Sequence, residues 1–112
     1  GQSQEEHAKI LADAKAVADA GAFSMVLEGV LESLAQAVTQ TVDIPVIGIG
    51  ASADCDGQVL VTDDMLGMFD RVPRFVKRYH EVANEIVDAA SQYAADVRSR
   101  SFPTQDQTYQ PK

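Results

Sequence analysis

The stretch FSMVLEG, residues 23–29, decides the fold, because a nearly continuous apolar run ends abruptly on a charged residue, Glu28. A short apolar run between two helical patterns is typical of a strand covered on both faces. A second such run, VIGIG at residues 46–50, follows after one helical segment. Strand, helix and strand joined by short connections predict parallel pairing. The pattern fits either a doubly wound sheet or a (β/α)8 barrel.

Helical patterns surround these two strands. Residues 4–20 repeat apolar side chains at a helical period, with Ser3 as the predicted cap and Gly21 just beyond the end. A second stripe covers residues 31–38, and Pro45 prevents its continuation. The region from Phe75 to about Arg98 predicts one or two further helices. Their expected buried face comprises Val76, Tyr79, Val82, Ile86, Ala89, Ala90, Tyr93 and Val97.

The charge of the chain is unevenly distributed. The net charge of −8 argues against a nucleic-acid-binding protein, which needs a clustered basic surface. The basic residues nevertheless concentrate after residue 70, where Arg71, Arg74, Lys77 and Arg78 lie close together in sequence. This cluster is either a solvated helix entry or a contact for an anion or another subunit.

The remaining composition predicts a cytoplasmic protein. The single cysteine, Cys55, cannot form an internal disulfide, and no apolar run is long enough to span a membrane. Two parallel strands are too few to cover their own edges and faces. We therefore expect the chain to be a fragment of a longer fold, with residues 1–102 forming the last strands and helices of one domain and residues 103–112 forming a polar tail.

Glu28 is the best candidate catalytic residue. A carboxylate directly after an apolar strand lies where barrel enzymes place catalysis, at the carboxyl ends of the strands. A carboxylate there can act as a general acid or base. The alternative is a solvated loop residue or an acid that begins the next helix.

The segment GIGASA, residues 48–53, has the residue spacing of the dinucleotide-binding fingerprint but lacks its structural context. That fingerprint needs a helix and then another strand, whereas the next apolar run already begins at Val59. We reject this interpretation. The glycines instead let a ligand or a neighbouring backbone approach the strand end, so Gly48, Gly50 and Ser52 are expected to line a substrate or cofactor pocket.

Four carboxylates follow within a short stretch: Asp54, Asp56, Asp63 and Asp64. Such a group can bind Mg²⁺ or Ca²⁺, but the EF-hand spacing is absent. We interpret the first pair as turn residues and the second as the cap and first turn of a short helix that ends near Met68. No metal ligand is assigned within the chain.

Six runs together resemble the C-terminal part of the ketopantoate hydroxymethyltransferase family. The resemblance extends from about residue 3 to Pro103. This chain departs from the family at EGVL (28–31), where the family usually has Glu-Cys-Val-Pro or Glu-x-Val-Pro, at GAS (50–52), where it commonly has Gly-Ala-Gly, and in the tail at QDQTY (105–109). The runs are DAGAF (19–23), VLE (26–28), IPVIGIGA (44–51), DCDGQVLV (54–61), DMLG (64–67) and RFVKRY (74–79).

The resemblance implies the C-terminal part of a (β/α)8 barrel with extra C-terminal helices. It implies transfer of a hydroxymethyl group from 5,10-methylenetetrahydrofolate to 3-methyl-2-oxobutanoate, giving ketopantoate for pantothenate and coenzyme A synthesis. Glu28 would be the proton acceptor. Mg²⁺ would be held by residues outside this chain, in the N-terminal part of the same barrel, so the fragment alone is expected to be inactive. The family works in the cytoplasm and forms homodecamers.

Two other functions remain open from the residues alone. One is a related barrel lyase or mutase that acts on a different oxo acid. The other is a non-catalytic α/β module that binds a protein through its acidic face or its C-terminal helices.

Overall fold

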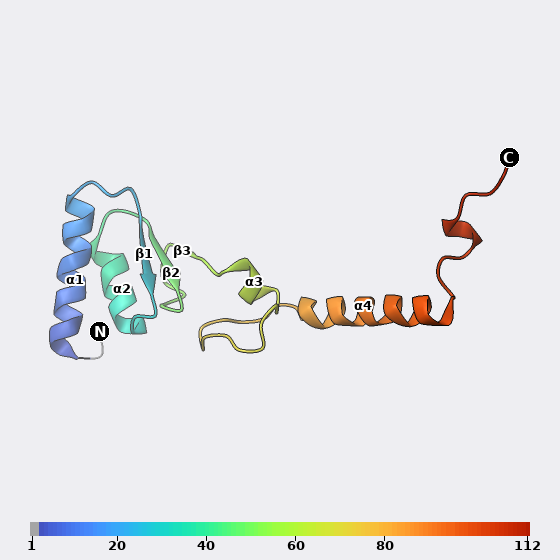
Figure 1. Cartoon of the computed structure of the whole chain (residues 1–112). Coiled ribbons are helices and arrows are strands. Elements are labelled where there is room, and N and C mark those ends of the chain that lie inside the picture. Colours follow the sequence, from blue (N-terminus) through green and yellow to red (C-terminus); the bar gives the residue numbers. More distant parts are fainter. Residues whose placement is uncertain (1–2) are drawn as a thin grey trace.

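The structure is a computed structural model that describes residues 3–112, and within them it contains a small parallel sheet and four α-helices. The elements follow one another along the chain as Figure 1 shows. Their bounds are α1 Gln4–Asp19, β1 Met25–Glu28, α2 Glu32–Thr41, β2 Val46–Ile49, β3 Gly57–Gln58, α3 Thr62–Met65 and α4 Val82–Ser99, with a 3₁₀ turn at Gln105–Gln107.

The three strands lie side by side in chain order and all run parallel. The register pairs Met25 of β1 with Val46 of β2, and Ile47 of β2 with Gly57 of β3. The predicted parallel pairing of the two apolar runs is therefore confirmed. The structure adds a short third strand, β3, directly before the apolar run that begins at Val59.

Helices α1 and α2 pack against each other and cover one face of the sheet (Figure 1). The core lies between them and the strands, and three of its side chains are fully buried: Leu34 and Val38 of α2 and Val46 of β2. Burying apolar surface in this way is the main favourable contribution to folding. The core of this chain is therefore a single layer between two helices and one sheet face.

The other face of the sheet is not covered by residues 3–112. Side chains alternate along β1, so Met25 and Leu27 point into the core while Val26 and Glu28 point away from it. Val26 is 60% exposed, and its register partner Ile47 is only half-buried. The expectation of strands covered on both faces is thus wrong for this chain, because all the packed helices lie on one side.

Helix α1 begins and ends as predicted. The Ser3 hydroxyl accepts a hydrogen bond from the Glu6 backbone N–H at 3.1 Å, which satisfies one of the free donors of the first turn. The helix ends at Asp19, with Ala20 as its C-cap and Gly21 directly beyond.

The predicted helix from Phe75 to Arg98 is wrong in its first part. Residues 75–81 form a loop, and α4 begins only at Val82. The backbone N–H of Tyr79 donates to Met65 at 2.8 Å, so this segment hydrogen-bonds to a distant part of the chain and not within a helix. The preceding short helix α3 also ends at Met65, earlier than the predicted Met68, and its cap is Val61 and not an aspartate.

Helix α4 projects away from the sheet (Figure 1), and no residue of it is buried. Its expected buried face includes Ile86 and Tyr93, which are more than half exposed. The radius of gyration is 23.8 Å, whereas a compact domain of this length would have about 13 Å. The burial prediction for α4 is wrong for this chain because residues 3–112 supply no surface for the helix to pack on.

Candidate functional site at the carboxyl ends of the strands

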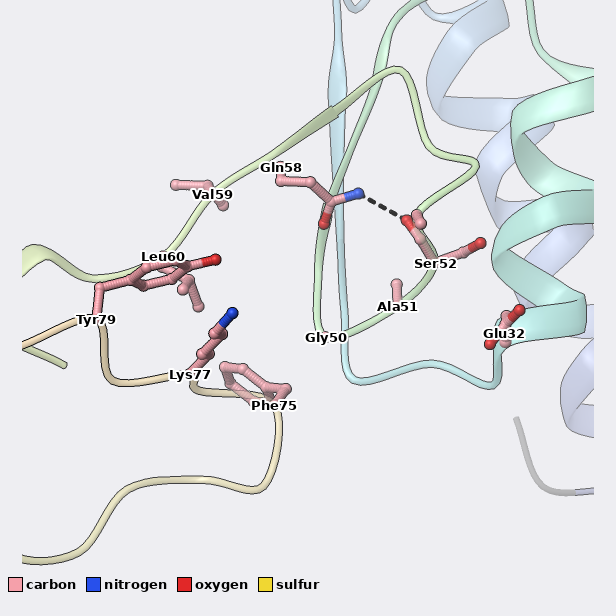
Figure 2. A pocket seen from close by; sticks show the side chains of 11 residues that line it. Glu32, Gly50, Ala51, Ser52, Gln58, Val59, Leu60, Phe75, Lys77 and Tyr79 are labelled. Atoms are coloured by element: carbon pink, nitrogen blue, oxygen red, sulfur yellow. Dashed lines mark hydrogen bonds between the residues drawn. The ribbon is translucent and has the colours of Figure 1, made fainter. Parts of the chain in front are cut away.

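Two cavities that share Gly50 and Phe75 lie at the carboxyl ends of β1 and β2. One cavity has a volume of about 450 Å³ and is lined by Gly29, Gly50, Arg74 and Phe75. The other cavity has a volume of about 470 Å³ and extends toward the loop after β2 and the segment from Phe75 to Tyr79 (Figure 2). Parallel α/β proteins bind their ligands at this end of the strands.

Glu28 is the last residue of β1 and lies on the uncovered face of the sheet. Its register partner is Ile49, and the next residue, Gly29, donates its backbone N–H to Ile49 at 3.0 Å. The Glu28 side chain is exposed and forms no hydrogen bond or ion pair with the described residues. The carboxylate is therefore available to a ligand beside the cavity that Gly29 lines.

Gly50 ends β2 in a left-handed conformation with φ of +62°. A Cβ atom at this position would overlap the side chain of Phe75. A glycine is needed here because any side chain would strain the left-handed backbone and would also push Phe75 away. The close neighbour at this strand end is thus the Phe75 ring, a side chain from far along the chain, where a ligand or a neighbouring backbone was predicted.

We expect Gly50→Ala to destabilise the protein by about 1–3 kcal/mol more than Gly29→Ala, because only the first adds an overpacking cost to the backbone strain. Gly29 is a matched control, since its φ is +61° and no atom lies within 4 Å of its added Cβ. Urea denaturation of both variants measures the difference. Equal free energies of unfolding would show that the Phe75 contact contributes nothing.

Gly48 and Ser52 occupy different surroundings. Gly48 is buried inside the sheet, and a Cβ there would lie 3.0 Å from Cys55 Sγ, so it makes room for this side chain. Ser52 lines the larger cavity. Its hydroxyl accepts from the Asp54 N–H at 3.0 Å, and its carbonyl accepts from Gln58 Nε2 at 2.6 Å (Figure 2). The structure thus brings Gly50 and Ser52 to one cavity, whereas Gly48 lines neither of the two cavities.

The acidic residues after β2 form structural hydrogen bonds. Asp56 accepts from the Val46 N–H at 2.8 Å and so satisfies the first backbone donor of β2. Asp54 accepts from Gln36 Nε2 at 2.8 Å and links the loop to α2. Their interpretation as turn residues is supported by both contacts. Within residues 3–112 no three His, Cys, Asp or Glu side chains gather as a metal site would require.

The basic cluster divides into residues with different surroundings. Arg78 donates to the backbone carbonyls of Phe69 and Asp70 at 3.1 and 2.7 Å, which holds the loop that precedes it. Arg74 and Lys77 line the two cavities instead. The sequence indicated an anion contact as one of two explanations for this cluster, but it could not show which of the cations reach the strand ends.

No helix in the part of the chain that the structure describes is both long and apolar enough to cross a membrane. The described residues therefore form a segment of a parallel α/β protein with two cavities at the carboxyl ends of its strands.

Comparison with known proteins gives the family. Residues 1–105 match the family described as Ketopantoate hydroxymethyltransferase, and the chain belongs to this family. The resemblance found in the sequence is thereby confirmed.

Several curated relatives are named 3-methyl-2-oxobutanoate hydroxymethyltransferase. The protein from Novosphingobium aromaticivorans is 63% identical over 112 residues, which is the whole chain and 39% of that protein. The protein from Sphingopyxis alaskensis is 65% identical over 109 residues, which is 97% of the chain and 38% of that protein. The chain thus spans about 39% of the length of the relatives it matches.

Proposed function

We propose that the chain is the C-terminal part of a 3-methyl-2-oxobutanoate hydroxymethyltransferase with a (β/α)8 barrel. The full-length enzyme transfers a hydroxymethyl group from 5,10-methylenetetrahydrofolate to 3-methyl-2-oxobutanoate and forms ketopantoate, a step in pantothenate and coenzyme A synthesis. The observation that carries the proposal is the 63% identity, over the whole chain, to a relative with this name.

The uncovered sheet face supports the barrel. Val26, Ile47 and Ile49 point to this face together with Glu28, although apolar side chains are normally buried. In a closed barrel such a face points inward, and side chains from the other strands fill the interior. The remaining strands would come from the part of the relatives that the chain does not span.

In this proposal Glu28 is the catalytic base. The reaction begins with removal of a proton from the carbon next to the ketone of the oxo acid, and a positioned carboxylate can accept that proton. The exposed Glu28 carboxylate at the strand end has no partner in residues 3–112 that would have to be displaced first. Gly50 and Ser52 belong to the wall of the adjoining pocket, and Gly48 makes room for Cys55 next to the sheet.

The proposal includes Mg²⁺, which would stabilise the negative charge on the deprotonated oxo acid. In this proposal its ligands belong to the N-terminal part of the barrel, outside this chain. We further propose a cytoplasmic homo-oligomer, a decamer, with no nucleic-acid or membrane partner.

The test is product formation by the full-length polypeptide that contains this segment. With Mg²⁺, 5,10-methylenetetrahydrofolate and 3-methyl-2-oxobutanoate, we expect ketopantoate to accumulate, detected by mass spectrometry. Omitting the folate should abolish it. Turnover of another oxo acid without folate, and none of 3-methyl-2-oxobutanoate, would instead identify a related lyase or mutase.

A further inference from the structure

Two cations lie at the strand-end cavities without a counter-ion. Lys77 lines the larger cavity and Arg74 the smaller one. Neither forms an ion pair or a side-chain hydrogen bond with residues 3–112. This is notable in a chain with a net charge of −8, where carboxylates outnumber cations.

The backbone that carries these cations is fixed on both sides. Phe75 lies against Gly50 at the end of β2, and the Tyr79 N–H donates to the Met65 carbonyl at 2.8 Å. The Lys77 ammonium lies 4.8 Å from the centre of the Tyr79 ring, a favourable cation–π distance. Lys77 is therefore held between two fixed points, and Arg74 directly precedes the first of them.

Figure 2 shows the Lys77 ammonium turned into the space between Leu60, Tyr79 and the loop after β2. Gln58 and Ser52 lie on the opposite side of this space, on the segment that follows β2. The carboxylate of Glu32 also lines the cavity, but it forms no ion pair with Lys77 and accepts from Gln36 Nε2 at 3.4 Å. Within residues 3–112, Lys77 therefore has no carboxylate at ion-pair distance.

We propose that Lys77 and Arg74 bind a carboxylate group of a substrate at the carboxyl ends of β1 and β2. This inference rests on the proposed function, in which both substrates are carboxylic acids. The carboxylate belongs either to 3-methyl-2-oxobutanoate or to the glutamyl group of the folate. A lysine provides a point charge and an arginine a planar fork that matches a carboxylate, so each of the two cations suits this group in the cavity that it lines.

The test uses Lys77→Ala and Arg74→Ala in the full-length polypeptide, with the Michaelis constant measured for each substrate at saturating concentration of the other. We expect the KM for one of the two to rise about tenfold or more and kcat to stay within about twofold, since a charge-assisted contact is lost. The substrate whose KM rises identifies the source of the carboxylate. Lys77→Arg should restore most of the affinity, because it keeps the charge.

Lys15→Ala is the matched control, because it removes an exposed cation from α1, outside both cavities. Both KM values of this control should equal those of the unchanged protein. Unchanged KM values in the two cavity variants, or a lower kcat at unchanged KM, would overturn the proposal. If the unchanged protein makes no product, the proposed function fails instead. Isothermal titration of each protein with 3-methyl-2-oxobutanoate and with tetrahydrofolate then still tests whether Lys77 and Arg74 bind a carboxylate. Equal affinities in the unchanged protein and all variants would overturn this role.

Discussion

Replacing Glu28 by glutamine is expected to lower the rate of α-proton exchange of 3-methyl-2-oxobutanoate by about 10²–10⁴-fold, the usual contribution of a positioned general base. The amide keeps the size of the side chain but cannot accept the proton. The rate is measured by NMR in D₂O with Mg²⁺, on the full-length polypeptide and without folate. This isolates proton removal from the later transfer of the one-carbon group.

Two further variants sharpen this test. Glu28→Asp retains a carboxylate on a shorter side chain, so it should exchange faster than Glu28→Gln and slower than the unchanged protein. Glu5→Gln removes an exposed carboxylate from the first turn of α1 and should leave the rate unchanged. An exchange rate that is the same in Glu28→Gln as in the unchanged protein would exclude Glu28 as the base.

Leu34→Ala is expected to lower the free energy of unfolding by about 3–5 kcal/mol, because it leaves a cavity where the side chain was fully buried. Leu34 of α2 is 0% exposed and belongs to the core cluster that α1, α2 and the strands share. Urea denaturation measures the loss from the shift of the transition midpoint at an unchanged slope.

Leu31→Ala removes the same atoms from a side chain that is 45% exposed, at the N-cap of the same helix. Its cost should be below about 1.5 kcal/mol, since less apolar surface is returned to water. Similar losses for both leucines would mean that the core does not lie between these two helices and the strands.

The first half of the fold could be predicted from the sequence because its signals are local. The apolar run that ends at Glu28, the one that ends at Gly50 and the helical stripes around them each follow from hydrophobic periodicity. The prediction of a helix fails at residues 75–81, where the helical periodicity continues but the backbone is a loop. A contact with Met65 decides the conformation there, and no local pattern encodes such a tertiary hydrogen bond.

The candidate site was predictable to a similar degree. Glu28 follows from its place after an apolar run, and Gly50 from the need for close approach at a strand end. The partner that approaches, Phe75, could not be predicted, because it comes from a segment whose position depends on tertiary packing. For the same reason the sequence could not separate Lys77 and Arg74, which line the cavities, from Arg78, which bonds to its own loop.

The basic segment before α4 is closed at its base by two backbone hydrogen bonds, from Tyr79 to Met65 at 2.8 Å and from Val82 to Leu66 at 3.0 Å. The entropy lost on closing a loop grows only slowly with its length, by about 0.6 kcal/mol for each doubling. Inserting residues directly after Arg71, beyond the Phe69 and Asp70 carbonyls that Arg78 binds, should therefore cost little stability. Loss of the two hydrogen bonds at the base of the loop should cost more stability than the insertion. Without them the whole segment is free to move, and Lys77 and Arg74 no longer stay at the strand ends.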